Sequence, residues 1–335
     1  MQYVELGKTG IQTSVIALGT WGIGGWMWGG ADEAESIDAI HAALDSGVNF
    51  IDTAPLYGFG RSEEVVGKAI AGRRDSVVLT TKCGIWWSKE PFPQGQGELH
   101  VYSNGGALGD AEHYDRILYR YLRPDSIRAE LERSLKLLGT DYLDLYQVHC
   151  QDATSRIAET METLLDLKKE GKIRAIGVSN VTPEQLAEYQ AVGYVDVLQE
   201  RFSLLDRGVQ TSGMAATVEK ESMTLLAYAP MVHGLLTGKL SPETKFPEGD
   251  FRAVTPLFAP ESIRAINEKL AKLQPLCEKY QATTTQIVLA WTFSTGPKTS
   301  VLCGARTAKH AIENAKAGAI ELTAEDRAMI DEIFQ

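Results

Sequence analysis

The chain has 335 residues, and 33 basic against 44 acidic side chains give it a net charge of −11. This balance excludes a general nucleic-acid binder, which needs a dense basic surface, and it argues against binding to anionic membranes. No segment approaches the ~20 consecutive apolar residues that span a bilayer, and the N-terminal residues lack a signal-peptide pattern. We therefore expect neither nucleic acid nor a membrane as a partner.

Eight short apolar runs recur along the chain, and a longer segment with a helical pattern follows each of them. Their apolarity is continuous rather than alternating, which predicts strands buried on both faces, as in a parallel sheet. In chain order the runs are Val15–Leu18, Val48–Ile51, Val77–Thr81, Tyr142–Val148, Ile176–Ser179, Val195–Gln199, Thr224–Tyr228 and Ser300–Cys303.

The segments between these runs carry start and stop signals for helices. Asp32 and Glu35 form a capping-box pattern, and Gly47 is expected to end the helix that they begin. Pro124 opens another helix, with a regular apolar stripe that ends before Gly139. Two further helix starts are expected at Thr182-Pro183-Glu184 and, for a C-terminal helical extension, at Thr323-Ala324-Glu325.

Eight strand–helix units predict an α/β fold of the (β/α)8 TIM-barrel type, as a single domain over residues 1–335. A doubly wound sheet is the alternative. It is disfavoured because Gly22 and Gly24 are followed by Met27, where its nucleotide-binding fingerprint requires a third glycine. The stretch from Gly84 to Leu122 lacks clean periodicity and predicts a long, functional βα loop after the third strand.

The four cysteines form no Cys-x-x-Cys pair, and a chain of this length needs no disulfides to fold. They are Cys83, Cys150, Cys277 and Cys303. We interpret them as free thiols, with Cys83 and Cys150 in the core, and expect a cytoplasmic protein.

Four titratable residues fall at or just after the ends of three successive predicted strands: Asp52, Tyr57, Lys82 and His149. In a barrel, reactive groups lie where strands end and βα loops begin. An ammonium beside a phenol favours the phenolate, and a carboxylate keeps that ammonium charged. An imidazole beside them can orient a carbonyl. The set predicts protonation of a carbonyl oxygen, although each residue alone is equally well explained by capping, packing or a structural ion pair.

These residues lie in motifs that resemble the aldo-keto reductase superfamily, in the bacterial branch that includes inositol-operon and general-stress reductases and the potassium-channel β subunits. The motifs run in order through nearly the whole chain: Leu6-Gly7-Lys8-Thr9-Gly10, Asp52-Thr53-Ala54-x-x-Tyr57-Gly58 with Ser62-Glu63, Lys82, Val148-His149, Gly177-Val178-Ser179-Asn180, Tyr228-Ala229-Pro230, and Gly304 with Glu313-Asn314. The resemblance implies reduction of an aldehyde or ketone, or the reverse oxidation, without a metal.

By this resemblance Tyr57 is the general acid, Lys82 and Asp52 tune it, and His149 positions the carbonyl. The implied cofactor is NADPH or NADP+, with NADH as the alternative. The matching cofactor positions are Thr20, Trp21 and Asp52 beside the nicotinamide; Ser179, Asn180 and Gln199 at its carboxamide; Tyr228 stacked on its ring; Ala229, Pro230, Met231, Val232, His233 and Lys239 over the pyrophosphate, with Arg252 nearby; and Gly304, Arg306, His310, Glu313 and Asn314 at the adenosine.

The substrate side is expected to include Trp21, Tyr57, Trp86, Trp87 and His149. Flat aromatic rings with polar edges suit a sugar- or polyol-like substrate as well as an apolar aldehyde. Two other functions stay open: a redox-sensing NADP(H)-binding subunit without catalysis, and a Schiff-base aldolase that uses Lys82. The sequence also leaves open whether the chain forms a homo-oligomer.

Overall fold

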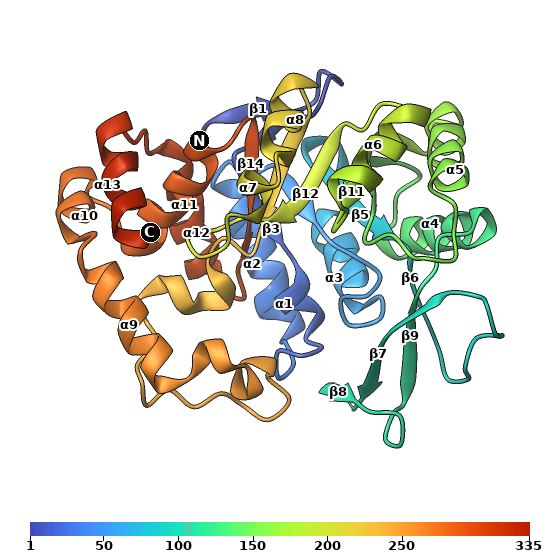
Figure 1. The fold of residues 1–335 in the computed structure, drawn as a ribbon, viewed down its shortest axis with the longest axis horizontal. Helices are drawn as coiled ribbons and strands as arrows, with labels where there is room; N and C mark the ends of the chain where they lie inside the picture. The colour runs from blue at the N-terminus through green and yellow to red at the C-terminus, as the bar shows by residue number, and fades with distance from the viewer. Residues whose placement is uncertain (106) are drawn as a thin grey trace.

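In the computed structural model, which describes residues 1–105 and 107–335, eight parallel strands close into a barrel (Figure 1). Each strand overlaps one of the eight predicted apolar runs, so the predicted (β/α)8 barrel is confirmed. In hydrogen-bonding order the strands are β3 (Ile16–Gly19), β4 (Phe50–Asp52), β5 (Val78–Cys83), β10 (Leu143–Val148), β11 (Ile173–Ser179), β12 (Val197–Arg201), β13 (Thr224–Tyr228) and β14 (Thr299–Gly304).

Helices surround the barrel (Figure 1). The predicted caps hold: Asp32 accepts a hydrogen bond from the Glu35 backbone N–H at 2.9 Å, and Gly139 ends α4 with a φ of 65°. The helices in the first two thirds of the chain are α1 (Trp21–Gly24), α2 (Glu33–Asp45), α3 (Arg61–Ile70), α4 (Pro124–Leu138), α5 (Ile157–Lys169), α6 (Pro183–Val192), α7 (Gly208–Thr211) and α8 (Met214–Lys220), with a 3-10 turn at Arg74–Ser76.

A lobe of helices follows β13 and carries the C-terminus (Figure 1). The C-terminal extension packs onto it, because Asp326 accepts a hydrogen bond from Lys279 at 2.7 Å. The elements are 3-10 segments Val232–Thr237, Phe251–Val254, Pro256–Phe258 and Ala317–Ala319, and helices α9 (Pro260–Ala271), α10 (Gln274–Tyr280), α11 (Thr284–Thr295), α12 (Ala308–Lys316) and α13 (Ala324–Phe334). Over the described ranges, no helix combines the length and the apolarity needed to cross a bilayer.

The N-terminal end of the barrel is closed by a hairpin of β1 (Tyr3–Glu5) and β2 (Gln12–Ser14). Leu6 and Ile11, between the two strands, are buried against the lower layer of barrel residues. That layer is apolar and consists of Ala17, Phe50, Val78, Leu145, Ala175, Val197, Leu226 and Leu302. The barrel is thus a packed core at this end, which leaves only its C-terminal end for chemistry.

The long segment after β5 folds into an antiparallel sheet that projects from the barrel (Figure 1). Its strands pair in the order β6 (Ile85–Ser88), β9 (Arg116–Arg120), β7 (Glu98–Asn104) and β8 (Ala107–Gly109). Gly106, inside the predicted loop, lies outside the described residues. We call this unit the inserted sheet. The predicted position of this segment, after the third barrel strand, is confirmed. The segment forms strands and not the predicted loop, because its backbone groups are satisfied by pairing between strands. Local periodicity does not reveal such pairing.

Candidate active site

A buried ion pair lies at the C-terminal end of the barrel. The Lys82 Nζ, on β5, is 2.6 Å from the Asp52 Oδ2 at the end of β4, and these side chains are 0% and 1% exposed. The same Nζ donates to the Thr53 carbonyl at 2.9 Å and to the Tyr57 hydroxyl at 3.3 Å. Three acceptors use the three N–H groups of an ammonium, so Lys82 is held charged and immobile.

Two buried amides fix the other carboxylate oxygen of Asp52. Gln199 and Gln147 donate to its Oδ1 at 3.0 and 3.3 Å. Gln199 was expected at the nicotinamide carboxamide; in the structure its side chain belongs to this network. Gln147 was not expected from the sequence. The Gln147 side chain has room because the residue opposite it on β11 is Gly177, where a Cβ would lie 2.7 Å from the Gln147 Cγ.

The position of Tyr57 is fixed by a close approach between the backbones of α1 and of the loop after β4. A Cβ on Gly24 would lie 2.4 Å from the Tyr57 carbonyl carbon, so the two segments can meet only at a glycine. His149 follows β10, and its ring stands edge-on to that of Tyr57 with 6.0 Å between centroids. The fold therefore brings Asp52, Lys82, Tyr57 and His149 together, as the strand-end argument predicted.

Burial dominates the protonation of these groups. It raises the pKa of Tyr57 well above its ordinary value, and the negative charge of Asp52 adds to that rise. The sequence argument expected Lys82 to lower this pKa; the loss of water around the phenol raises it instead. Burial also lowers the pKa of Lys82, which the Asp52 charge opposes. The pKa of His149 falls well below its usual range through burial and the nearby Lys82. Tyr57 is thus a protonated phenol beside a neutral imidazole.

A chain of polar side chains continues from His149 toward β13. Asn180 donates its Nδ2 to the His149 carbonyl at 2.9 Å and to the Ser179 Oγ at 3.1 Å. Its Oδ1 accepts from the Tyr228 hydroxyl at 2.7 Å. On the other side of the mouth, the Thr20 hydroxyl donates to the Asp52 carbonyl at 2.9 Å. The residues expected around a nicotinamide therefore surround the four titratable groups.

The loop after β13 turns back over the mouth and meets the loop after β3. Ala229, Val232 and His233 have positive φ angles of 54°, 46° and 53°, flanking Pro230 and Met231 in a tightly wound path. The Trp21 ring packs against the His233 ring at 5.7 Å and stacks on Phe251 at 5.6 Å between centroids. Phe251 was not expected from the sequence. These ring contacts join the segments after β3 and after β13.

Several cations lie in and around the loop after β13. Arg252 is bonded to Asp250 at 2.7 Å and to the His233 carbonyl at 3.2 Å. Lys239 reaches Glu313 on α12 at 3.1 Å, which joins the loop after β13 to the last barrel helix. The remaining predicted adenosine positions lie on or just before α12. The Arg306 guanidinium, before the helix, donates to the Trp28 and Gly30 carbonyls at 3.3 and 2.7 Å. His310, in the first turn, is exposed, and Asn314, in the last turn, donates to the Gly304 carbonyl at 3.1 Å.

The two tryptophans of β6 lie on opposite faces of the inserted sheet, because neighbouring residues of a strand alternate. Trp87 packs on Phe59 at 5.4 Å between centroids, and the Arg133 guanidinium lies 4.1 Å from its ring. Trp86 pairs with Tyr119 across the sheet. The thiols behave as expected: all four cysteines are buried, and burial raises the pKa of Cys150 to about 11.

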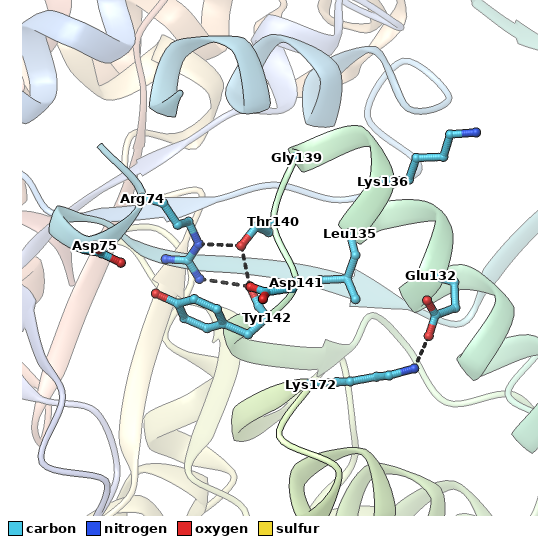
Figure 2. A pocket seen from close by; sticks show the side chains of 10 residues that line it. All are labelled: Arg74, Asp75, Glu132, Leu135, Lys136, Gly139, Thr140, Asp141, Tyr142 and Lys172. Atoms are coloured by element: carbon cyan, nitrogen blue, oxygen red, sulfur yellow. Dashed lines mark hydrogen bonds and ion pairs between the residues drawn. The ribbon is translucent and has the colours of Figure 1, made fainter. Parts of the chain in front are cut away.

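A hollow of about 800 Å³ lies at the opposite, N-terminal end of the barrel strands (Figure 2). Several of its polar groups already bond to one another. Arg74 donates to the Thr140 hydroxyl and the Tyr142 carbonyl, both at 3.0 Å, and Lys172 pairs with Glu132. Figure 2 shows these side chains turned toward each other. We assign this hollow to stability, since barrel chemistry belongs to the other end.

Comparisons with known proteins agree with this geometry. Residues 15–335 match the Aldo/keto reductase family. The chain belongs to that family. The aldo-keto reductase YhdN of Bacillus subtilis (strain 168) is 40% identical over 314 residues, which cover 91% of this chain and 85% of that protein. The NADH-specific methylglyoxal reductase of Escherichia coli (strain K12) is 38% identical over 341 residues, covering 100% of this chain and 99% of that protein.

Among solved structures, the glycerol dehydrogenase AKR11B4 from Gluconobacter oxydans has a TM-score of 0.85 to this aldo-keto reductase, with 34% identity over 99% of this chain and 94% of that one. Aldo-keto reductases use NAD(P)H. These residues suit such a dinucleotide, because the amide of Asn180 and the hydroxyl of Ser179 lie near His149. Two cations lie farther out: Arg306 just before α12, and Lys239 against Glu313 on α12.

Proposed function

We propose that this aldo-keto reductase reduces an aldehyde or ketone to an alcohol, or catalyses the reverse oxidation, with Tyr57 as general acid and base. One observation carries the proposal: the Tyr57 hydroxyl lies 3.3 Å from the Lys82 ammonium, which is itself paired with Asp52 at 2.6 Å. A phenol held in this way keeps its proton at neutral pH yet has a cation ready to stabilise the phenolate left behind.

NAD(P)H supplies the hydride to the carbonyl carbon when it is bound. As negative charge grows on the carbonyl oxygen, Tyr57 donates its proton there, and the Lys82 ammonium stabilises the phenolate. The neutral imidazole of His149 holds the same oxygen through an N–H donor. In the direction of oxidation the phenolate takes the hydroxyl proton back. The oxygenated substrates named for two relatives, methylglyoxal and glycerol, support a small polar substrate.

For the cofactor we propose NADPH, with Arg306 binding its 2′-phosphate. A guanidinium grips a phosphate through paired hydrogen bonds, and Arg306 is exposed at the start of α12. Arg306→Ala is expected to raise KM for NADPH at least about tenfold more than KM for NADH, since only NADPH carries that phosphate. Steady-state kinetics with both cofactors measures this. Equal changes in the two KM values would contradict the assignment.

Neither alternative function has support of the same kind. A Schiff-base aldolase needs a neutral lysine free to attack a carbonyl, whereas all three Lys82 donors are bound to oxygen. A sensor without catalysis needs no positioned imidazole beside the phenol, yet the His149 ring lies 6.0 Å from that of Tyr57. We also propose that the chain works in a reducing cytoplasm, which its four free, buried thiols support.

The test is a panel of sugars, small hydroxyaldehydes, ketones and aromatic aldehydes, each assayed with NADPH and NADH. Turnover of at least one carbonyl compound is expected, with the reduced cofactor consumed in equal amount. Cofactor binding without turnover anywhere in the panel would favour the sensor. Trapping of Lys82 by borohydride in the presence of a ketone would favour the aldolase.

A further inference from the structure

Ser62 belongs to the Ser62-Glu63 motif at the start of α3, to which the proposed reaction assigns no role. Its side chain is fully buried. The hydroxyl does not cap the helix, because α3 begins after Gly60 without a side-chain cap. Within a helix, serine is slightly less favourable than alanine, so helix formation does not explain the residue. The contacts of its hydroxyl group lie outside the helix.

Three buried hydroxyl groups form a directed chain through Ser62. The Thr53 hydroxyl donates to the Ser62 Oγ at 3.0 Å, and the Ser62 hydroxyl donates to the Thr20 Oγ1 at 2.7 Å. The Thr20 hydroxyl in turn donates to the Asp52 carbonyl at 2.9 Å. Each hydroxyl gives its one proton to the next acceptor, and all three residues are buried. Hydrogen bonds in such a chain strengthen one another, so loss of the middle hydroxyl disturbs both neighbours.

Ser62 also closes the loop that carries Tyr57. The loop begins at Thr53, and the hydrogen bond between the Thr53 and Ser62 side chains joins its two ends. The Ser62 backbone N–H donates to the Tyr57 carbonyl at 3.1 Å, so the same residue contacts the middle of the loop. The Thr53 carbonyl accepts from the Lys82 Nζ at 2.9 Å. Ser62 therefore connects Tyr57 to the segment that holds Lys82.

The next residue, Glu63, attaches the same helical turn to β5. The Thr81 hydroxyl donates to the Glu63 carboxylate at 2.7 Å, and both side chains are buried. Thr81 directly precedes Lys82 in the strand. The first turn of α3 is thus bonded both to the loop that carries the phenol and to the strand that carries the ammonium. These are the two partners of the 3.3 Å hydrogen bond between Lys82 and Tyr57.

We propose that Ser62 is a positioning residue for the proton transfer: its hydroxyl closes the loop that begins at Thr53 and so holds the Tyr57 phenol at hydrogen-bond distance from Lys82. This role rests on the proposed function, because it acts through the proton that Tyr57 donates. Without the Ser62 hydroxyl, the buried Thr53 hydroxyl loses its acceptor and the loop loses the bond between its ends. A small displacement of the phenol then slows the reaction, since proton transfer requires the donor within hydrogen-bond reach.

The experiment is a double-mutant cycle between Ser62 and Tyr57. It measures single-turnover hydride transfer to methylglyoxal with NADPH prebound at saturation, so that altered cofactor affinity does not enter the rate. Ser62→Ala is expected to lower this rate about 10- to 100-fold, the range for a displaced catalytic group. In the Tyr57→Phe background, which has no phenol proton to position, the same change should lower the rate less than about threefold, because residues that act as a unit are not additive.

Two further variants complete the design. Thr53→Val removes the same hydrogen bond from its other end with a side chain of similar shape, and it should reproduce the fall and its dependence on Tyr57. This variant carries the cycle if Ser62→Ala does not fold. Ser36→Ala is the matched control, because Ser36 is a buried serine near the start of α2 whose hydroxyl donates to the Asp32 carbonyl at the beginning of its own helix. Its loss should leave the rate unchanged.

The outcomes separate this role from the proposed function. An equal fall in the wild-type and Tyr57→Phe backgrounds would mean that Ser62 supports the fold or the cofactor, and it would overturn the positioning role. So would a wild-type rate in Ser62→Ala and in Thr53→Val. In both cases the proposed reductase stands. A wild-type rate in Tyr57→Phe alone would instead overturn the proposed function.

Discussion

The strand ends of the barrel and the inserted sheet face the same mouth, but they hold their polar groups differently. Asp52 and Lys82 are 1% and 0% exposed, and their charged atoms lie 2.6 Å apart. On the inserted sheet, Glu98 and Arg120 are 39% and 34% exposed, with 3.4 Å between them. The first pair is further bonded by Thr53, Tyr57 and two glutamines, whereas the Arg120 Nε has no acceptor among the described residues.

This difference separates a buried network with fixed geometry from a partly exposed ion pair. A general acid works only if its geometry and protonation are fixed before the substrate arrives, which requires the buried, fully bonded network at the strand ends. The Glu98–Arg120 pair on the inserted sheet is partly open to water and lies outside this network.

The largest contrast is expected in stability. Asp52→Asn removes the counter-charge of a fully buried ammonium, and the expected loss in the free energy of unfolding is about 3–5 kcal/mol. Arg120→Met is the matched control, because it breaks a partly exposed pair and should cost less than about 1 kcal/mol. Urea denaturation of both variants and the wild type measures these values. Equal losses in the two variants would remove the distinction between the regions.

The pH dependence of turnover sharpens the same contrast. Burial raises the pKa of Tyr57 and lowers that of His149, so neither group titrates between about pH 7 and 9. Reduction needs the protonated phenol, and its kcat should be level across this range. Oxidation needs the phenolate, and its rate should rise about tenfold per pH unit, because the phenolate fraction does so below the pKa.

Single-turnover rates of reduction and oxidation measure this dependence, since they isolate the chemical step from product release. The Arg120→Met variant should keep the same profiles. If the single-turnover rate of reduction fell between pH 7 and 8, the phenol would be losing its proton in the neutral range. Oxidation that does not depend on pH would show that Tyr57 is not the base.

Much of the barrel mouth follows from local sequence. Buried parallel strands need continuous apolar runs, so their ends, and with them Asp52, Lys82 and His149, can be located in the chain. Helix caps such as Thr182, which forms a capping box with Gln185, depend on residues three apart and are equally visible. These features rest on short-range rules, which explains why they were predicted correctly.

The remaining features depend on contacts between distant segments. A bulge in β7 at His100 exists only through the register of β7 against β9. Phe251 reaches Trp21 across more than half of the chain, and no local pattern marks that contact. The raised pKa of Tyr57 has the same origin, because segments distant in the sequence bury this residue. Burial and register are properties of the assembled fold.

The most direct test of the account is the hydride-transfer rate of Tyr57→Phe, measured by stopped-flow in single turnovers of prebound NADPH with methylglyoxal. The variant keeps the ring and its packing and loses only the hydroxyl that lies 3.3 Å from Lys82. We expect cofactor binding at wild-type affinity and a rate about 10²- to 10⁴-fold lower, the contribution of a positioned general acid. A rate within a few-fold of wild type, with the cofactor bound, would contradict the assignment of Tyr57.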